Sequence, residues 1–287
     1  MANTRAILLM TAAMAAFAIS DAFINRAAES LPTGQILAIT CALSLIPFVF
    51  RLRKSDERLF SAKLRHPAFL IRTAGEVLGS LGYVMALSLV PLATASALLQ
   101  AQPLAATMAA AVILGEHVGP RRWTAVGLGF VGVLMIIRPG AEAFDPNALW
   151  TLLGIVGFTA RDLGTRLLPK DISTPFVSFW ALFVLGLLGF AIMPVDGAWR
   201  PLESLTWIWL VGCSASVAVA FVVITAALRI GEISAIAPFR YTRMVFALAI
   251  AILLLGENPD AMTWAGTALI ICSGIYAFWR ERTLSRK

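Results

Sequence analysis

Long apolar runs alternate with short polar connections along nearly the whole chain. Ten of these runs approach the length of about 17 to 25 residues that an α-helix needs to cross a bilayer core. They cover approximately residues 6–25, 34–50, 68–88, 93–114, 123–137, 148–165, 175–193, 205–228, 233–255 and 262–279. The longest polar connection, Arg51 to His66, is too short for a soluble domain. The pattern predicts an all-α membrane protein with ten transmembrane helices.

The second half of the sequence matches the first when it is shifted by 141 residues. The shift pairs Phe17 with Phe158, Asp21 with Asp162, Thr33 with Thr174, Ala86-Leu87 with Ala227-Leu228, Gly115-Glu116 with Gly256-Glu257, and Trp123 with Trp264. About five apolar runs fit into this distance, and an odd number of crossings turns the second copy upside down. We therefore predict two inverted five-helix repeats, 1–141 and 142–287, in one membrane domain. Such repeats around a midplane site are typical of secondary transporters.

Composition and charge agree with a lipid environment. Hydrophobic residues make up 59% of the chain and charged residues 14%, which is too little polar surface for a soluble protein of this size. The net charge of +7 arises mainly from the loops on one side of the predicted bundle. That side carries sixteen Lys and Arg residues, and the other carries only Arg26, Arg138 and Arg200. Because basic loops stay in the cytoplasm, we expect cytoplasmic termini and no nucleic-acid partner.

Motifs for catalysis or metal binding do not fit these helices. Gly127, Gly129 and Gly132 have the spacing of a dinucleotide fingerprint, but they lie inside an apolar run instead of following a strand. We interpret them, like Gly75 with Gly79, as small residues that allow close helix packing. The three cysteines are isolated in apolar runs. We expect no enzymatic activity, no cofactor and no metal.

Several segments resemble the EamA-type drug/metabolite transporter superfamily. They are Ala86 to Ala95, Ile113 to Glu116, Arg121 to Gly140, Ala237 to Arg243 and Leu254 to Glu257. The resemblance extends over essentially the whole chain. It implies ten helices in inverted repeats and a bacterial inner-membrane location. Members of the superfamily are associated with export of amino acids and other metabolites, and related subgroups with uptake of riboflavin or S-adenosylmethionine. YddG-like amino-acid exporters are the subgroup to which we compare this chain.

Charged side chains within the predicted spans are the first candidates for function. They are Asp21, Arg72, Glu76, Arg161, Asp162, Arg240 and Arg243. Each is costly there, by at least about 2.5–3.5 kcal/mol on insertion scales, so a retained charge favours a functional role. Arg72 and Glu76 also have the i, i+4 spacing of a local ion pair, which leaves a purely structural role open.

A central binding site is predicted where polar segments of the two repeats meet. Arg240, Tyr241 and Arg243 lie near mid-membrane in the ninth run, and subtracting 141 gives Leu99 to Gln102, with Gln100 and Gln102. We expect these five polar residues to border one cavity. An arginine fork suits a carboxylate, so the expected substrate is a small molecule that carries one. The alternative is that these groups only neutralise charges and join helices.

Further residues are assigned to this site or to gates. Glu76 and Tyr83 are expected at the site, and Trp180 joins it as part of an aromatic face with Phe176, Phe179 and Phe183. Packing against lipid or helices is the alternative for that face. Asp21 and its repeat equivalent Asp162 are expected at opposite ends of the membrane. They are candidates for gating or proton coupling, together with Arg161 and Arg72; helix-end solvation and an Asp162–Arg166 pair are the alternatives.

The sequence thus favours an alternating-access carrier that exports amino acids, aromatic ones included, or similar small metabolites. Uptake of a larger metabolite such as riboflavin or S-adenosylmethionine is the alternative within transport. A non-transporting scaffold or receptor is a second alternative, and it would pair all the intramembrane charges and lack a central cavity. The expected partners are the lipid bilayer and the substrate, and the sequence does not predict an oligomeric state.

The charge asymmetry of the loops predicts the topology directly. In a variant without the three native cysteines, a new cysteine between Pro194 and Ser204 should react with an impermeant thiol reagent added to intact cells. A cysteine between Arg51 and His66 should react only after the cells are permeabilised. Modification of the second position in intact cells would reverse the assigned orientation.

Overall fold

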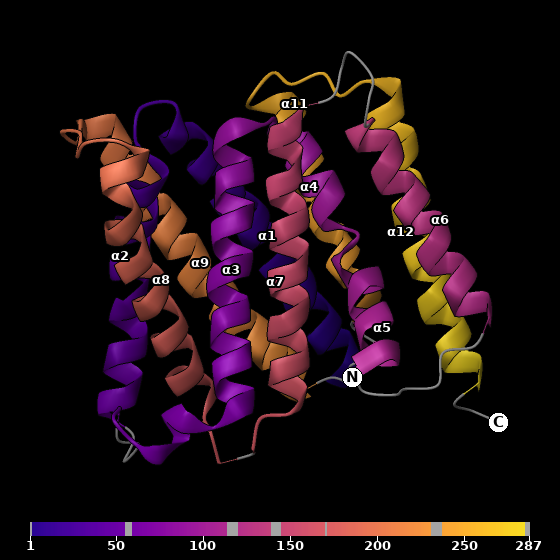
Figure 1. The fold of residues 1–287 in the computed structure, drawn as a ribbon, viewed down its shortest axis with the longest axis horizontal. Coiled ribbons are helices and arrows are strands. Elements are labelled where there is room, and N and C mark those ends of the chain that lie inside the picture. The colour runs from indigo at the N-terminus through magenta and orange to yellow at the C-terminus, as the bar shows by residue number, and fades with distance from the viewer. Residues whose placement is uncertain are drawn as a thin grey trace.

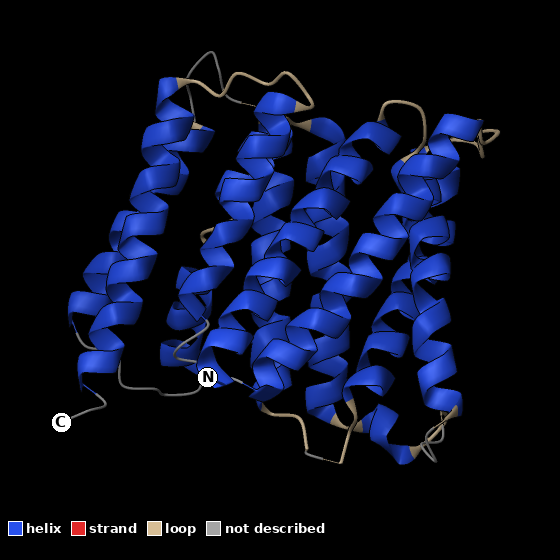
Figure 2. Cartoon of the chain, turned by 180° about the vertical axis from the view of Figure 1, so that it is seen from behind, coloured by secondary structure: helices blue, strands red, loops and turns tan. Residues whose placement is uncertain are grey.

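The computed structural model describes residues 2–54, 59–113, 120–138, 145–169, 171–230 and 237–284. Within these residues every regular element is helical (Figures 1 and 2). The helices are α1 Ala2–Ala28, α2 Thr33–Arg53, η1 Ala62–Arg65, α3 Pro67–Leu89, α4 Leu92–Leu99, α5 Gln102–Ile113, α6 Pro120–Ile137, η2 Pro146–Ala148, α7 Leu149–Arg166, α8 Thr174–Asp196, α9 Ser204–Ile230, η3 Ala237–Tyr241, α11 Thr242–Leu253 and α12 Ala261–Leu284. Six described segments are long and apolar enough to span a bilayer, and two shorter apolar helices accompany them. The predicted all-α membrane fold is confirmed.

The helices of the second repeat run in the opposite direction to their equivalents in the first. The chain enters α1 from the side on which both labelled ends lie, whereas α7 runs back toward that side (Figure 1). Helix α3 packs along α7 and α1 along α9, while α2 packs on α8 and α6 on α12. Replacing each helix by the one 141 residues away leaves this set of pairs unchanged. The exchange symmetry confirms the inverted repeat.

Glycines bring α3 and α7 into backbone contact. A Cβ atom on Gly157 of α7 would lie 2.8 Å from the carbonyl oxygen of Gly75 and would also collide with the backbone of Gly79. A Cβ on Gly82 of α3 would lie 2.7 Å from the backbone nitrogen of Gly154. The predicted close packing at Gly75 and Gly79 is therefore confirmed. The contact places the polar side chains of α3 beside those of α7.

Helices α6 and α12 form a separate pair at one edge of the bundle (Figure 1). A Cβ on Gly132 would lie 2.8 Å from the carbonyl oxygen of Gly266, so this glycine has the predicted packing role. Gly127 does not, because no described atom lies within 4 Å of the corresponding position. Arg138, which follows α6, donates to the carboxylate of Asp260 before α12, and this hydrogen bond lowers the pKa of Asp260 to about 2.

Two spans are broken at equivalent places. Helix α4 ends at Leu99 because Pro103 has no N–H group to donate to the Leu99 carbonyl. The boundary between η3 and α11, at Tyr241, lies 141 residues after Gln100. The side-chain amide of Gln100 donates to the carbonyl oxygen of Tyr241 over 3.2 Å. Equivalent residues thus touch each other, and the pseudo-twofold axis passes between them.

The end of α11 is bound to the start of α4. Gly256 has a φ of 71°, which glycine adopts without strain, and the chain turns there. Both carboxylate oxygens of Glu257 then accept hydrogen bonds from backbone N–H groups, from Leu92 over 2.8 Å and from Ala93 over 2.9 Å. The second repeat therefore caps a helix of the first. The equivalent pair, Gly115 and Glu116, lies outside the described residues.

Two alanine substitutions test the packing interpretation of the glycines. Gly157→Ala should lower the thermal midpoint of the detergent-solubilised protein, because overpacking against a backbone costs about 1–3 kcal/mol. Gly127→Ala is the matched control, since its new methyl group meets no described atom, and it should leave the midpoint unchanged or slightly raised. Equal midpoints for the two variants would contradict the backbone contact between α3 and α7.

Candidate functional site

A cavity of about 420 Å³ lies at the centre of the bundle. Its lining comes from α1, α2, α3, α4, α5, α7, α8, α9 and the η3–α11 segment. Among the described residues, none of α6 or α12 lines it. The two broken spans contribute Gln100, Gln102, Arg240, Tyr241 and Arg243, so the cavity lies beside the pseudo-twofold axis.

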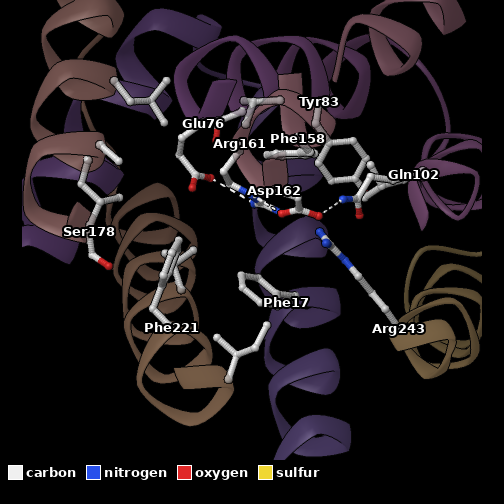
Figure 3. A pocket seen from close by; sticks show the side chains of 18 of the residues that line it. Phe17, Glu76, Tyr83, Gln102, Phe158, Arg161, Asp162, Ser178, Phe221 and Arg243 are labelled. Carbon is white, nitrogen blue, oxygen red and sulfur yellow. Dashed lines mark hydrogen bonds and ion pairs between the residues drawn. The ribbon is translucent and has the colours of Figure 1, made fainter. Parts of the chain in front are cut away.

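Charges of alternating sign form a row along one wall of this cavity. The guanidinium of Arg72 lies 3.2 Å from the carboxylate of Glu76, whose other oxygen accepts a hydrogen bond from Arg161 over 3.3 Å. Arg161 also donates to Asp162 over 3.0 Å. Asp162 in turn lies 3.7 Å from Arg240, which ends the row. Figure 3 shows Glu76, Arg161 and Asp162 side by side along this wall.

A second ion pair lies between α1 and α11. Arg243 binds Asp21 with two nitrogens, over 3.0 Å from Nε and 2.8 Å from Nη2. Its guanidinium lies 5.1 Å from the ring centre of Phe17 and 5.2 Å from that of Tyr83. The Tyr83 hydroxyl donates to Asp21 over 3.2 Å and lies 3.3 Å from the hydroxyl of Ser96. Asp21 is 2% exposed, so one buried carboxylate joins α1, α3 and α11.

The two repeats build the same contact with different side chains. The amide of Gln102 in the first repeat donates to Asp162 in the second, and Arg243 in the second repeat donates to Asp21 in the first. Both partners differ by 141 residues between the two contacts. The aromatic ring four residues before each aspartate also recurs, since Arg161 lies 4.6 Å from the ring centre of Phe158. Because Gln102 is neutral, Arg161 and Arg240 supply the positive charge for Asp162.

Most of the predicted site residues line this one cavity. They are Arg72, Glu76, Tyr83, Gln100, Gln102, Arg161, Asp162, Arg240, Tyr241 and Arg243. Asp21 lies directly behind Tyr83 and Arg243. The hydroxyl of Tyr241 is buried against Gly274 and has no hydrogen-bond partner in the described part of the chain. The structure also confirms the local Arg72–Glu76 ion pair.

The expected place of Trp180 is wrong. Its indole nitrogen donates to the carbonyl oxygen of Leu59, and its ring centre lies 5.4 Å from that of Phe60. The cavity is lined by the neighbouring face of α8, which carries Ser178, Ala181, Leu182 and Leu185. Both faces of this helix are apolar, and packing against α2 and α3 decides which one turns inward.

Two further expectations need correction. Asp21 and Asp162 do not lie at opposite ends of the membrane, because they pair with Arg243 and Arg240, which are only three residues apart. For the same reason the two arginines do not form one fork. The long arginine side chains extend to carboxylates on different helices. The prediction used only the depth of each residue along its helix, which does not show where a long side chain ends. The side chain of Arg166, the alternative partner of Asp162, lies outside the described residues.

The sequence interpretation missed three aromatic residues of the cavity, Phe17, Phe158 and Phe221. A signal for two of them was present. Phe17 and Phe158 are repeat equivalents, and each precedes an aspartate by four residues, which places the ring and the carboxylate on one helix face. Phe221 has no such signal, because its repeat equivalent is Ser80.

A family model described as the EamA-like transporter family matches residues 4–138 and 146–279. The chain belongs to this family. It is therefore a secondary transporter of small molecules and a multi-pass membrane protein. The resemblance of its motifs to this superfamily is confirmed, and so is the expectation that it is not an enzyme.

Relatives with different named substrates are similar to almost the whole chain. An S-adenosylmethionine uptake transporter of Rickettsia bellii is 24% identical and covers 86% of this chain and 82% of its own. A riboflavin transporter of Vibrio cholerae is 25% identical, with 98% and 95% covered. The pseudopaline exporter CntI of Pseudomonas aeruginosa is 26% identical, with 94% of each chain covered. A solved structure titled "Crystal structure of protein" superposes with a TM-score of 0.64 at 18% identity, over 98% of this chain and 99% of that one, which supports the fold alone.

A double-mutant cycle tests the buried ion pair of this EamA-family carrier. Asp21→Ala should lower the free energy of unfolding by about 3–5 kcal/mol, because it leaves Arg243 as an uncompensated buried charge. Removing both partners should lower the free energy of unfolding by less than the sum of the two single changes. Unfolding in increasing SDS gives the measurement. The exposed pair of Arg26 and Glu29 is the control and should contribute no more than about 1 kcal/mol. Additive effects at Asp21 and Arg243 would contradict the pairing.

Proposed function

We propose that this carrier exports amino acids or similar small metabolites with a carboxylate across the bacterial inner membrane, with both termini in the cytoplasm. The proposal rests on the environment of the Arg240 side chain. Its guanidinium lies 3.7 Å from Asp162 and makes no hydrogen bond in the described part of the chain. At 32% its side chain is the most exposed of the four arginines that line the cavity.

Arg240 can therefore donate hydrogen bonds to a substrate, whereas Arg243 already donates its hydrogen bonds to Asp21. The nitrogens of Arg243 bind Asp21, and its guanidinium is held between Phe17 and Tyr83. A carboxylate is the acceptor that a planar guanidinium binds best, often with two parallel hydrogen bonds. Asp162, 24% exposed beside Arg240, can accept a hydrogen bond from an ammonium group of the same substrate. An amino acid carries both groups.

The architecture supports an alternating-access mechanism. The cavity lies beside the axis that relates the two inverted repeats, and the broken spans of both repeats reach it. Rocking one repeat against the other around such a site would expose it to each side in turn. Three ion pairs of the cavity join different helices, so Asp21, Arg161 and Asp162 are groups that could exchange partners when the repeats move. Arg72 pairs within α3, but it shares Glu76 with Arg161 and could keep that carboxylate neutralised when Arg161 leaves.

Uptake of a larger metabolite is the second candidate. It is favoured by the relatives that are named for S-adenosylmethionine uptake and for riboflavin. Another relative is named as an exporter, so the names of the relatives include both directions of transport. Proteoliposomes loaded with amino acids, riboflavin or S-adenosylmethionine separate the candidates, because each substrate either exchanges with its labelled form or does not.

The proposed carboxylate anchor is tested by substitutions of one residue. Arg240→Ala should reduce the initial rate of amino-acid counterflow about 10- to 100-fold, because a hydrogen bond to a charged group is worth about 1.5–3 kcal/mol. Arg240→Lys should keep only part of the rate, since it lacks the planar pair of donors. Arg51→Ala, at an exposed helix end, is the control. Thermal midpoints measured on the same samples should stay close to the wild-type value, because Arg161 still pairs with Asp162. Wild-type counterflow in Arg240→Ala would rule out this anchor.

A further inference from the structure

Two equivalent helices line the cavity with side chains of different polarity. Helices α3 and α9 are repeat equivalents, and each sends four residues at equivalent positions to the cavity lining. The four pairs are Arg72 with Cys213, Glu76 with Val217, Ser80 with Phe221, and Tyr83 with Ile224. In every pair the residue of α3 carries a charge or a hydroxyl group, whereas the residue of α9 is largely apolar.

We infer that the substrate is amphipathic, and that α9 forms a subsite for its apolar group in which Val217 and Phe221 determine specificity. This inference rests on the proposed function, because it describes the other end of the molecule that Arg240 binds. The chemical class is an amino acid with an apolar side chain. Its charged head group lies on the wall of Glu76, Arg161, Asp162 and Arg240, and its side chain on α9.

The geometry gives the apolar group a defined place. Phe221 lies across the open space from Glu76 and Arg161 (Figure 3). Its ring is fixed by edge contacts, with ring centres 5.9 Å from Phe17 and 6.2 Å from Phe48. Val217 lies one helical turn before Phe221 and is half-buried. Together they present apolar surface to the cavity, and burying an apolar side chain there removes that surface from water.

The same arrangement rejects polar side chains. Neither Val217 nor Phe221 has a side-chain donor or acceptor, so a polar group placed against them loses its water without gaining a hydrogen bond. A pocket of this kind separates ligands by the apolar surface that they bury. The α9 wall would bind a charged group as the α3 wall does only if position 217 carried a charge, as its repeat equivalent Glu76 does. The asymmetry therefore also fixes the orientation of the substrate.

An isosteric substitution tests the subsite without opening a hole in the protein. Val217→Thr replaces a methyl group by a hydroxyl group of similar size on the cavity side of α9. Val219→Thr is the matched control on the same helix, because Val219 is 53% exposed on the outer surface. The probes are L-phenylalanine and L-serine, which share the head group and differ in the side chain. Each is measured as a competitor of amino-acid counterflow in proteoliposomes.

Val217→Thr should raise the half-inhibitory concentration of L-phenylalanine about 3- to 10-fold and leave that of L-serine within about 2-fold of wild type, with Val219→Thr unchanged for both. Phe221→Ala should shift the same ratio in the same direction. An unchanged ratio in Val217→Thr, with both probes still inhibiting and Arg240→Ala still slowed as expected, would overturn the subsite and leave the proposed function intact. Failure of every amino acid to exchange or inhibit in the wild type would overturn both.

Discussion

A charge inside a bilayer persists only beside an opposite charge, and this constraint determines how the helices of the protein meet. Asp21 on α1 binds Arg243 on α11, Glu76 on α3 binds Arg161 on α7, and Asp162 on α7 faces Arg240 of η3. The first two pairs join a helix of one repeat to a helix of the other, and the third joins two helices of the second repeat. Without these pairs the charged side chains would stand alone in hydrocarbon, where an isolated charge is not stable. The cavity is the space that remains where these pairs converge.

The sequence predicted those features that depend on period and register. The shift of 141 residues placed Gln100 opposite Tyr241, and their side chain and carbonyl are in contact. It did not predict the rotation of α8, because the face with Trp180 and the face with Leu182 are equally compatible with an apolar helix. It also did not predict that Arg243 binds Asp21, since residues 222 positions apart are joined only by the folded chain. Register is local information, whereas rotation and pairing depend on the neighbours of each helix.

Symmetry of the backbone and asymmetry of the side chains have separate roles here. The inverted repeat provides equivalent helices and equivalent breaks on both sides of one axis. The chemistry then diverges: Gln102 stands where Arg243 stands in the other repeat, and Val217 where Glu76 stands. A fully symmetric site could bind a molecule equally well in two orientations. The divergence gives the cavity a charged end and an apolar end, so a bound molecule has one preferred orientation.

The cap that Glu257 places on α4 has a consequence for the order of assembly. The chain is made from its N-terminus, so the N–H groups of Leu92 and Ala93 are inserted long before the carboxylate that binds them exists. Helix α3 likewise lacks the glycine surface of α7 until the second repeat has emerged. The main packing partners of α1, α2, α3 and α6 all lie in the second repeat, so the first half of this fold is completed only when the second half has been made.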